Sequence, residues 1–256
     1  MNKVLENIVN YWDKQPCNFT NSTEKEQNLK FFNDTSKNRY FVEPHVRDFT
    51  QFHLYQGKRV LEIGCGIGID AAEFIKNGAI YTGIDISQNS LSVAKNRLDT
   101  LGLQGELLCR NGDNISDLGE FDLVYSYGVL HHYPGISDIV DQVHKVLTNN
   151  GEFKFMVYAK NSWKYAMILK GLDQYEAQAG CPYAKAYTKE DIYQLLDDKF
   201  SIARIRQAHC FMYNVEKYKQ GIYELEPWFA AMTDDMREAI KEYLGWHLLV
   251  KAVKIA

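Results

Sequence analysis

The sequence lacks several features that would assign the chain to a class at once. It has five cysteines, an odd and scattered set without a Cys-x-x-Cys pair. This pattern argues against a disulfide framework and a zinc site, and it favours the reduced cytoplasm as the location. No apolar run is long enough to cross a bilayer, and the N-terminus lacks the apolar core of a signal peptide. A membrane partner is therefore not expected.

An excess of charge of one sign is also missing. The formal net charge is −4, and no dense Lys/Arg run with interleaved aromatic residues occurs. A nucleic-acid partner is not expected, although a local basic patch can lie within an acidic total. Internal repeats and low-complexity tracts are absent as well. A length of 256 residues suits one large α/β domain with insertions, or one domain with a small cap.

What is present is concentrated in residues 60–70, Val-Leu-Glu-Ile-Gly-Cys-Gly-Ile-Gly-Ile-Asp. The branched apolar residues at its start are typical of a central parallel strand. Gly64, Gly66 and Gly68 allow the backbone to turn sharply and approach a ligand, and the helix that follows begins with unpaired N–H groups. The dinucleotide pattern Gly-x-Gly-x-x-Gly would need glycine at position 69, which is Ile69. The segment therefore favours a nucleoside ligand without a diphosphate.

Strand-like and helix-like segments alternate after this motif. Strands are expected at 59–64, 79–85, 105–109, 121–127 and 152–158, and two more at 200–207 and 246–254. Helices that begin near Ser87 and Ser137 carry their apolar residues on one face. The alternation predicts an α/β fold with a doubly wound, mostly parallel sheet and right-handed crossovers. Such sheets bind ligands at the carboxyl ends of their strands.

The segments around this core predict covering elements. The apolar spacing of residues 4–12 predicts a helix that ends before Pro16, then a polar loop over 17–38 and a helix over 40–52. Residues 1–56 are therefore expected to form an N-terminal helical segment over the ligand site, and 57–256 the main domain. Aromatic-rich insertions at 160–187 and 211–244 are expected to be helical caps. Thr188-x-x-Asp191 predicts a helix capping box between them.

Several motifs occur in one order and spacing. They are Glu62-Ile-Gly-Cys-Gly-Ile-Gly68, Thr82-Gly-Ile-Asp-Ile-Ser87, Asn111-Gly-Asp113, the segment 121–134, Leu147-Thr-Asn-Asn-Gly-Glu-Phe153 and the segment 245–254. Together they resemble the motifs of class I S-adenosylmethionine-dependent methyltransferases, over residues 57–160 and again near the C-terminus. The resemblance implies a Rossmann-like sheet of seven strands, whose antiparallel last strand lies between the fifth and sixth. It also implies S-adenosylmethionine as cofactor and S-adenosylhomocysteine as product.

The resemblance assigns cofactor-binding roles to individual residues. Gly64 and Gly66 would admit the methionine end of the cofactor, Asp85 would accept the ribose hydroxyls, and Asp113 would accept the adenine amino group. Each has a structural alternative: Asp85 could only neutralise a helix N-terminus, for example, and Gly112-Asp113 could be a plain turn. The other expected cofactor contacts are Glu62, Cys65, Ile86, Asn114 and Ser126, with Arg39 and Tyr40 from the N-terminal segment.

Catalysis would need little acid–base machinery, because the methyl group of a sulfonium is already activated. His131 is the preferred candidate for a general base and for a substrate contact, while His132 is expected to cap the next helix or brace the loop. The other candidates are Tyr187 as a catalytic residue and Tyr158 and His209 as substrate contacts. His247 is expected to be structural or exposed. No carboxylate–histidine cluster has ligand spacing along the sequence, so no metal is expected.

The expected function is transfer of a methyl group from S-adenosylmethionine to a nitrogen or oxygen of a small molecule by in-line displacement. One alternative is a methyltransferase that acts on a peptide, a protein or tRNA. Another is a non-catalytic module that binds S-adenosylmethionine, and a nicotinamide oxidoreductase is disfavoured by Ile69. The sequence leaves the acceptor and the oligomeric state open.

Overall fold

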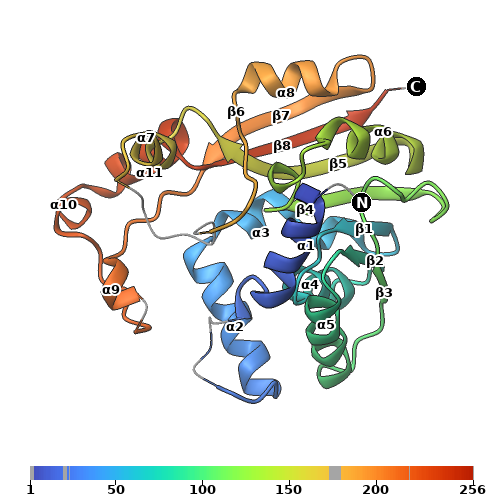
Figure 1. Ribbon diagram of the computed structural model, residues 1–256, viewed down its shortest axis with the longest axis horizontal. Coiled ribbons are helices and arrows are strands. Elements are labelled where there is room, and N and C mark those ends of the chain that lie inside the picture. Colours follow the sequence, from blue (N-terminus) through green and yellow to red (C-terminus); the bar gives the residue numbers. More distant parts are fainter. Residues whose placement is uncertain (1–2, 20–21, 23, 173–179, 219, 256) are drawn as a thin grey trace.

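A central sheet organises the chain, whose computed structural model describes residues 3–19, 22, 24–172, 180–218 and 220–255 (Figure 1). The strand order is β3-β2-β1-β4-β5-β8-β7, and the two-residue β6 pairs with β5 as an eighth strand. The strands are β1 (Arg59–Ile63), β2 (Ile80–Asp85), β3 (Glu106–Cys109), β4 (Phe121–Tyr127), β5 (Leu147–Ala159), β6 (Ala186–Tyr187), β7 (Phe200–Ala208) and β8 (His247–Lys254). All pairs are parallel except those of β8. The predicted position of an antiparallel last strand is confirmed.

Helices cover both faces of this sheet (Figure 1). On one face, α6 (Ile136–Val146) and α8 (Lys189–Leu196) bury apolar residues against β1, β4, β5 and β8. On the other face, α2 (Leu29–Val42), α3 (His45–Thr50) and α4 (Ile69–Lys76) pack with the 3₁₀ turn η2 (Phe52–Tyr55) and with Val93 of α5 (Gln88–Thr100). This three-layer arrangement confirms the α/β prediction. The central strands are buried on both faces, which explains their continuous apolar runs.

The predicted helix starts in the core are confirmed by their caps. Ser87 accepts a hydrogen bond from the Ser90 N–H at 3.0 Å and begins α5. Thr188 Oγ1 accepts from the Asp191 N–H at 3.0 Å, and Asp191 accepts from the Thr188 N–H at 2.8 Å, which completes the capping box of α8. Both caps satisfy N–H groups that a helix leaves unpaired at its start.

The N-terminal segment differs from its prediction. The expected loop over 17–38 is wrong in its second half, because α2 begins at Leu29 with Asn28 as its N-cap. Its buried Thr35 is satisfied inside the protein, because the buried Arg97 donates to Thr35 Oγ1 at 2.8 Å and also to the Phe32 carbonyl at 3.0 Å. The expected helix over 40–52 is divided into α2 and α3, because Pro44 cannot donate an N–H within a helix.

The insertions consist of short elements. Residues 211–244 hold α9 (Val215–Tyr218), α10 (Pro227–Ala230) and α11 (Asp234–Leu244), and the first two lie beside the sheet at the left of Figure 1. Residues 160–187 hold α7 (Trp163–Leu169) and β6, while 173–179 of that predicted cap lie outside the described residues. Within the described ranges, no helix has the length and apolarity needed to span a membrane. The division at residue 56 stays a prediction.

Candidate functional site

A cavity of about 540 Å³ opens where β1, β2 and β4 end. The glycine-rich loop after β1 forms one wall, and Asp85 and Ile86 at the end of β2 continue it. Tyr11 and Trp12 of α1 (Lys3–Lys14) and Phe211 of the second insertion also line the cavity. The carboxyl ends of parallel strands are where a doubly wound sheet is expected to bind its ligand.

The helix α1 is held over this cavity by one carboxylate. Asp13 Oδ1 accepts from the Ser87 hydroxyl and from the Asn89 N–H, each at 3.0 Å, at the start of α5. Asp13 thereby lies beside the positive end of a helix dipole, where a negative charge is stabilised. This contact places the aromatic residues of α1 at the cavity.

The glycine loop and Asp85 form one hydrogen-bonded unit. Asp85 Oδ2 accepts from the Gly66 N–H and Oδ1 accepts from the Ser87 N–H, both at 2.8 Å. Burial raises the pKa of Asp85, and these N–H groups oppose that shift. Gly64 has a φ of +79°, and a Cβ there would lie 2.2 Å from Val129 Cγ2, whereas a Cβ at Gly66 would meet no atom within 4 Å. The open side of Gly66 leaves the backbone accessible to a ligand.

Glu62 also borders the cavity although it belongs to the buried strand β1. Its carboxyl group accepts a hydrogen bond from the Tyr81 hydroxyl. Burial and the nearby carboxylates of Asp70 and Asp85 raise the pKa of Glu62 well above its usual value. A protonated Glu62 can both donate and accept a hydrogen bond at the cavity wall.

Nine of the expected site residues lie together in the cavity lining, and six do not. The lining contains Arg39, Glu62, Gly64, Cys65, Gly66, Asp85, Ile86, Tyr158 and His209. The residues outside it are Tyr40, Asp113, Asn114, Ser126, His131 and Tyr187. The roles of all these residues in binding or catalysis stay predictions.

The residues outside the lining have other partners. The Tyr40 hydroxyl donates to Asp70 Oδ1 at 2.6 Å, and the Ser126 hydroxyl donates to the Ile63 carbonyl at 2.9 Å, so both side chains tie elements together. Tyr187 is buried in the core beneath α8, and Asn114 is exposed. Asp113 accepts a hydrogen bond from the hydroxyl of Tyr133, which does line the cavity.

The two adjacent histidines lie differently at the cavity. His131, the preferred base candidate, is fully buried outside the lining, with its ring centroid 3.5 Å from that of Tyr158, and its role stays a prediction. His132 lines the cavity instead. Its Nδ1 lies 2.8 Å from the Tyr183 carbonyl, which can only accept, so the neutral ring carries its lone pair on Nε2. Burial lowers the pKa of His132 to about 4.

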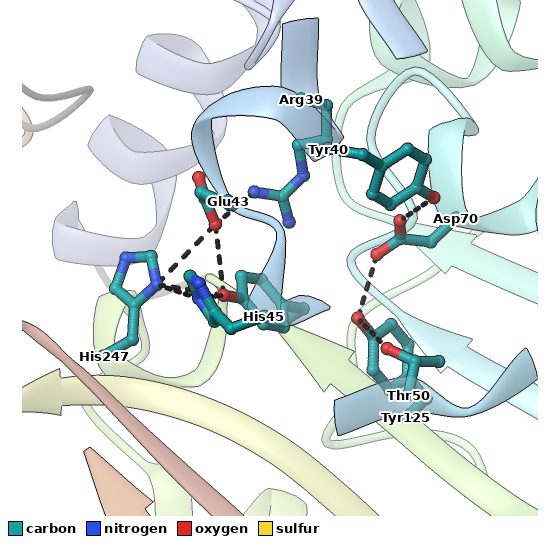
Figure 2. A network of polar contacts seen from close by, with 9 residues as sticks. Arg39, Tyr40, Glu43, His45, Thr50, Asp70, Tyr125 and His247 are labelled. Carbon is teal, nitrogen blue, oxygen red and sulfur yellow. Dashed lines mark hydrogen bonds and ion pairs between the residues drawn. The ribbon is translucent and has the colours of Figure 1, made fainter. Parts of the chain in front are cut away.

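Beside the glycine loop, a polar network links α2, α3 and α4 to β4 and β8. Figure 2 shows Asp70 between Tyr40 and Tyr125, and the Tyr125 hydroxyl donates to Asp70 Oδ2 at 2.9 Å. Next to the histidines of this network, Glu43 forms an ion pair with the buried Arg39. Burial raises the pKa of Glu43, but Arg39, through its charge and its hydrogen bond, and the neighbouring histidines together lower it further, so the net shift is downward. Glu43 is therefore ionised at neutral pH.

Sequence reasoning missed the histidine part of this network. His247, expected to be structural or exposed, is buried and lines the cavity. Glu43, His45 and His247 each offer a ligand atom, and these atoms lie within 4.8 Å of one another, although no metal was expected. Because His45 and His247 are 202 positions apart, no spacing along the chain could have indicated this cluster.

Comparison with known sequences identifies related proteins. Residues 61–153 match the family model described as a methyltransferase domain. The ubiquinone biosynthesis O-methyltransferase of Coxiella burnetii is 28% identical over 119 residues, which cover 46% of this chain and 51% of that protein. The protein of the same name from Thiobacillus denitrificans is 31% identical over 119 residues, with the same 46% and 51% coverage. The chain thus spans about half the length of these relatives.

Comparison with solved structures extends the similarity to the fold. Magnesium protoporphyrin IX methyltransferase from Synechocystis PCC 6803 with bound S-adenosylmethionine has a TM-score of 0.62 and 15% identity, and the match covers 100% of this chain and 99% of that one. The N-methyltransferase NodS from Bradyrhizobium japonicum WM9 has a TM-score of 0.56 and 15% identity, over 86% of this chain and 99% of that one. At this identity, the likeness concerns the arrangement of strands and helices.

Proposed function

We propose that this chain, which has the class I methyltransferase fold, binds S-adenosylmethionine and transfers its methyl group to a nitrogen or oxygen of a small-molecule acceptor. The observation that carries the proposal is the pairing of the Gly66 N–H with the Asp85 carboxylate on the cavity wall. A carboxylate at the end of the second strand is placed to accept ribose hydroxyls. The glycine loop beside it has room for a ligand but lacks the third glycine of a diphosphate site.

The residues at the cavity fit an adenosine joined to an amino acid. Asp85 offers carboxylate oxygens to the ribose, and the open face of Gly66 admits close approach of the ligand. Arg39 keeps its positive charge next to Glu43 and borders the cavity, where it can donate to the carboxylate of the amino acid. When bound, S-adenosylmethionine supplies a methyl group that is already activated by the positive sulfur.

The acceptor side of the proposal rests on His132 and on the aromatic lining. His132 presents a neutral ring at the cavity, and its low pKa makes it a weak base. A weak base suffices if the proton leaves as the acceptor atom acquires positive charge, because the proton is then strongly acidic. Tyr158, Phe211 and Trp12 offer apolar surface that excludes water around a compact substrate. The Coxiella and Thiobacillus relatives are named as O-methyltransferases, which is consistent with a small acceptor.

The proposal also includes the covering segments and the cellular location. We infer that residues 1–56 and the insertion 211–244 act as a cover for the cofactor, since Trp12 and Phe211 from these segments border the cavity. A cytoplasmic location is consistent with the five cysteines, which are all free thiols.

Calorimetry and a transfer assay test this function. The purified chain is titrated with S-adenosylmethionine and, separately, with NAD, and it is then incubated with methyl-labelled S-adenosylmethionine and a panel of phenols and amines. We expect saturable binding of S-adenosylmethionine, no binding of NAD, and label transfer to at least some acceptors. Binding of NAD in place of S-adenosylmethionine would contradict the cofactor assignment. Binding of S-adenosylmethionine without transfer to small molecules, peptides or tRNA would identify a non-catalytic module.

A further inference from the structure

We propose that Glu43, His45, Tyr127 and His247 form a binding site for one divalent transition-metal ion at the cavity wall. Three of these residues, Glu43, Tyr127 and His247, line the cavity, and His45 stands behind them on α3. The methyl transfer proposed above does not require this ion, so the inference stands independently of that function.

The spacing of the four side-chain atoms is that of ligands around a common centre. Tyr127 Oη lies 2.8 Å from His45 Nε2, 2.9 Å from His247 Nδ1 and 3.1 Å from Glu43 Oε2. His247 Nδ1 lies 3.2 Å from His45 Nε2 and 3.6 Å from Glu43 Oε2. Ligands bound at about 2.0–2.2 Å from one ion stand roughly 3.0–3.5 Å apart when they are neighbours. Figure 2 shows Glu43, His45 and His247 directed toward one another.

Hydrogen bonding alone does not satisfy this cluster completely. Four contacts of 3.2 Å or less join the four atoms. The hydroxyl of Tyr127 and the two ring nitrogens supply at most three hydrogens, and the Glu43 carboxylate, which is paired with Arg39, supplies none. At least one of the four contacts therefore lacks a matched donor and acceptor, and a cation among the four atoms would satisfy it.

Protonation and charge also suit a transition metal. The neutral imidazole is the form that ligates a metal, and the ring nitrogens His45 Nε2 and His247 Nδ1 both face the centre of the cluster. His209 stacks on His247 with ring centroids 4.5 Å apart and fixes the plane of that ring. Arg39, paired with Glu43, opposes any cation, so binding depends on imidazole ligands. Imidazole ligands select Zn²⁺, Co²⁺ or Ni²⁺ over Mg²⁺ and Ca²⁺.

Metal titration without S-adenosylmethionine tests the site. The chain is stripped with a chelator and titrated with Co²⁺, followed by visible absorption, and with Zn²⁺ and Mg²⁺, followed by calorimetry. We expect one Co²⁺ or Zn²⁺ per chain and no binding of Mg²⁺. His45→Ala should weaken Zn²⁺ binding by about tenfold or more, because a ligand is lost. His53→Ala, which removes an exposed histidine elsewhere, is the matched control and should bind as the native chain does.

The outcome does not depend on the enzymatic proposal, because no cofactor or acceptor is present. Circular dichroism of each variant verifies the fold, and Tyr127→Phe gives a second test that keeps the ring. Absence of Co²⁺ and Zn²⁺ binding to the native chain would overturn the inference. Equal affinity in the native chain, His45→Ala and Tyr127→Phe would overturn it as well, since the ion would then bind elsewhere.

Discussion

At the scale of single residues, Asp85 connects the end of β2 to the glycine loop and is the sharpest test of the cofactor site. Asp85→Ala should weaken S-adenosylmethionine binding by about tenfold or more, because a charged acceptor for two hydroxyls is lost. The isosteric variant Asp85→Asn keeps one oxygen acceptor, so its affinity for S-adenosylmethionine should lie between those of the native chain and Asp85→Ala. Calorimetry measures all three proteins. An unchanged affinity in Asp85→Ala would remove this residue from the site.

The same scale shows where sequence reasoning succeeds and where it stops. Gly64, Gly66 and Asp85 belong to short motifs whose local geometry is nearly fixed, and all three reach the cavity as expected. His131 and His132 are neighbours in the 3₁₀ turn η3 (Leu130–His132), and their ring centroids lie 4.2 Å apart. Of the two, His132 lines the cavity, and both rings contact Tyr158 of β5, a partner that no local pattern encodes.

At the scale of elements, the cap of α8 makes a quantitative prediction. Thr188→Ala removes the acceptor of the Asp191 N–H, and it should lower the free energy of unfolding by about 1 kcal/mol. Thr188→Ser retains the hydroxyl and serves as the control, with stability close to that of the native chain. Urea denaturation followed by circular dichroism measures both. Equal losses in the two variants would show that the hydroxyl is not the source of the effect.

Elements with a periodic apolar face were predictable, and α2, which lacks one in its first half, was not. The alternating strands and the helix after Ser87 follow directly from apolar periodicity and cap residues. The first half of α2 has two adjacent aromatic residues, Phe31 and Phe32, in place of a periodic apolar face, and both are buried in the core. Arg97 of α5, far along the chain, donates to the backbone of α2 and to Thr35. The apolar periodicity of residues 17–38 could not have indicated that contact with Arg97.

At the scale of the whole molecule, buried neutral histidines predict loss of stability in acid. For His132, the folded pKa of about 4 lies below the ordinary 6.5, so below pH 6.5 the unfolded chain binds more protons than the folded chain. The free energy of unfolding should therefore fall as the pH drops from 6.5 toward 4. The shift from 6.5 to about 4 corresponds to roughly 3 kcal/mol in full, of which about 2 kcal/mol is lost by pH 5.

Urea denaturation at pH 7 and pH 5 checks this expectation. His131, His45 and His247 have pKa values lowered in the same direction by burial, whereas the raised pKa of Glu62 changes stability in the opposite direction. The test is therefore the contribution of His132 itself, and His132→Gln should reduce the loss of stability between the two pH values. An equal loss in the native chain and in His132→Gln would contradict the neutral state of this ring.

The mostly parallel sheet was predictable at this scale, and the family resemblance implied the place of its last strand, whereas the assembled cavity was only partly predictable. The wall formed by β1 and β2 follows from consecutive strands, but other lining residues come from α1, α2 and β8, which tertiary packing brings together. The cluster of Glu43, His45 and His247 exists only after β8 has packed beside α3.

The position of β8 has a consequence for how the chain folds. This strand enters between β5 and β7 and pairs residues as distant as Glu152 and Val253, a separation of 101 positions. Bringing such remote segments together carries a large entropic cost, so this pairing is expected among the slowest steps of folding. Since His247 is the first residue of β8, the cluster of Glu43, His45 and His247 forms in the same event that pairs β8 with β5 and β7. The ligand chamber therefore reaches its finished shape only when the final strand docks.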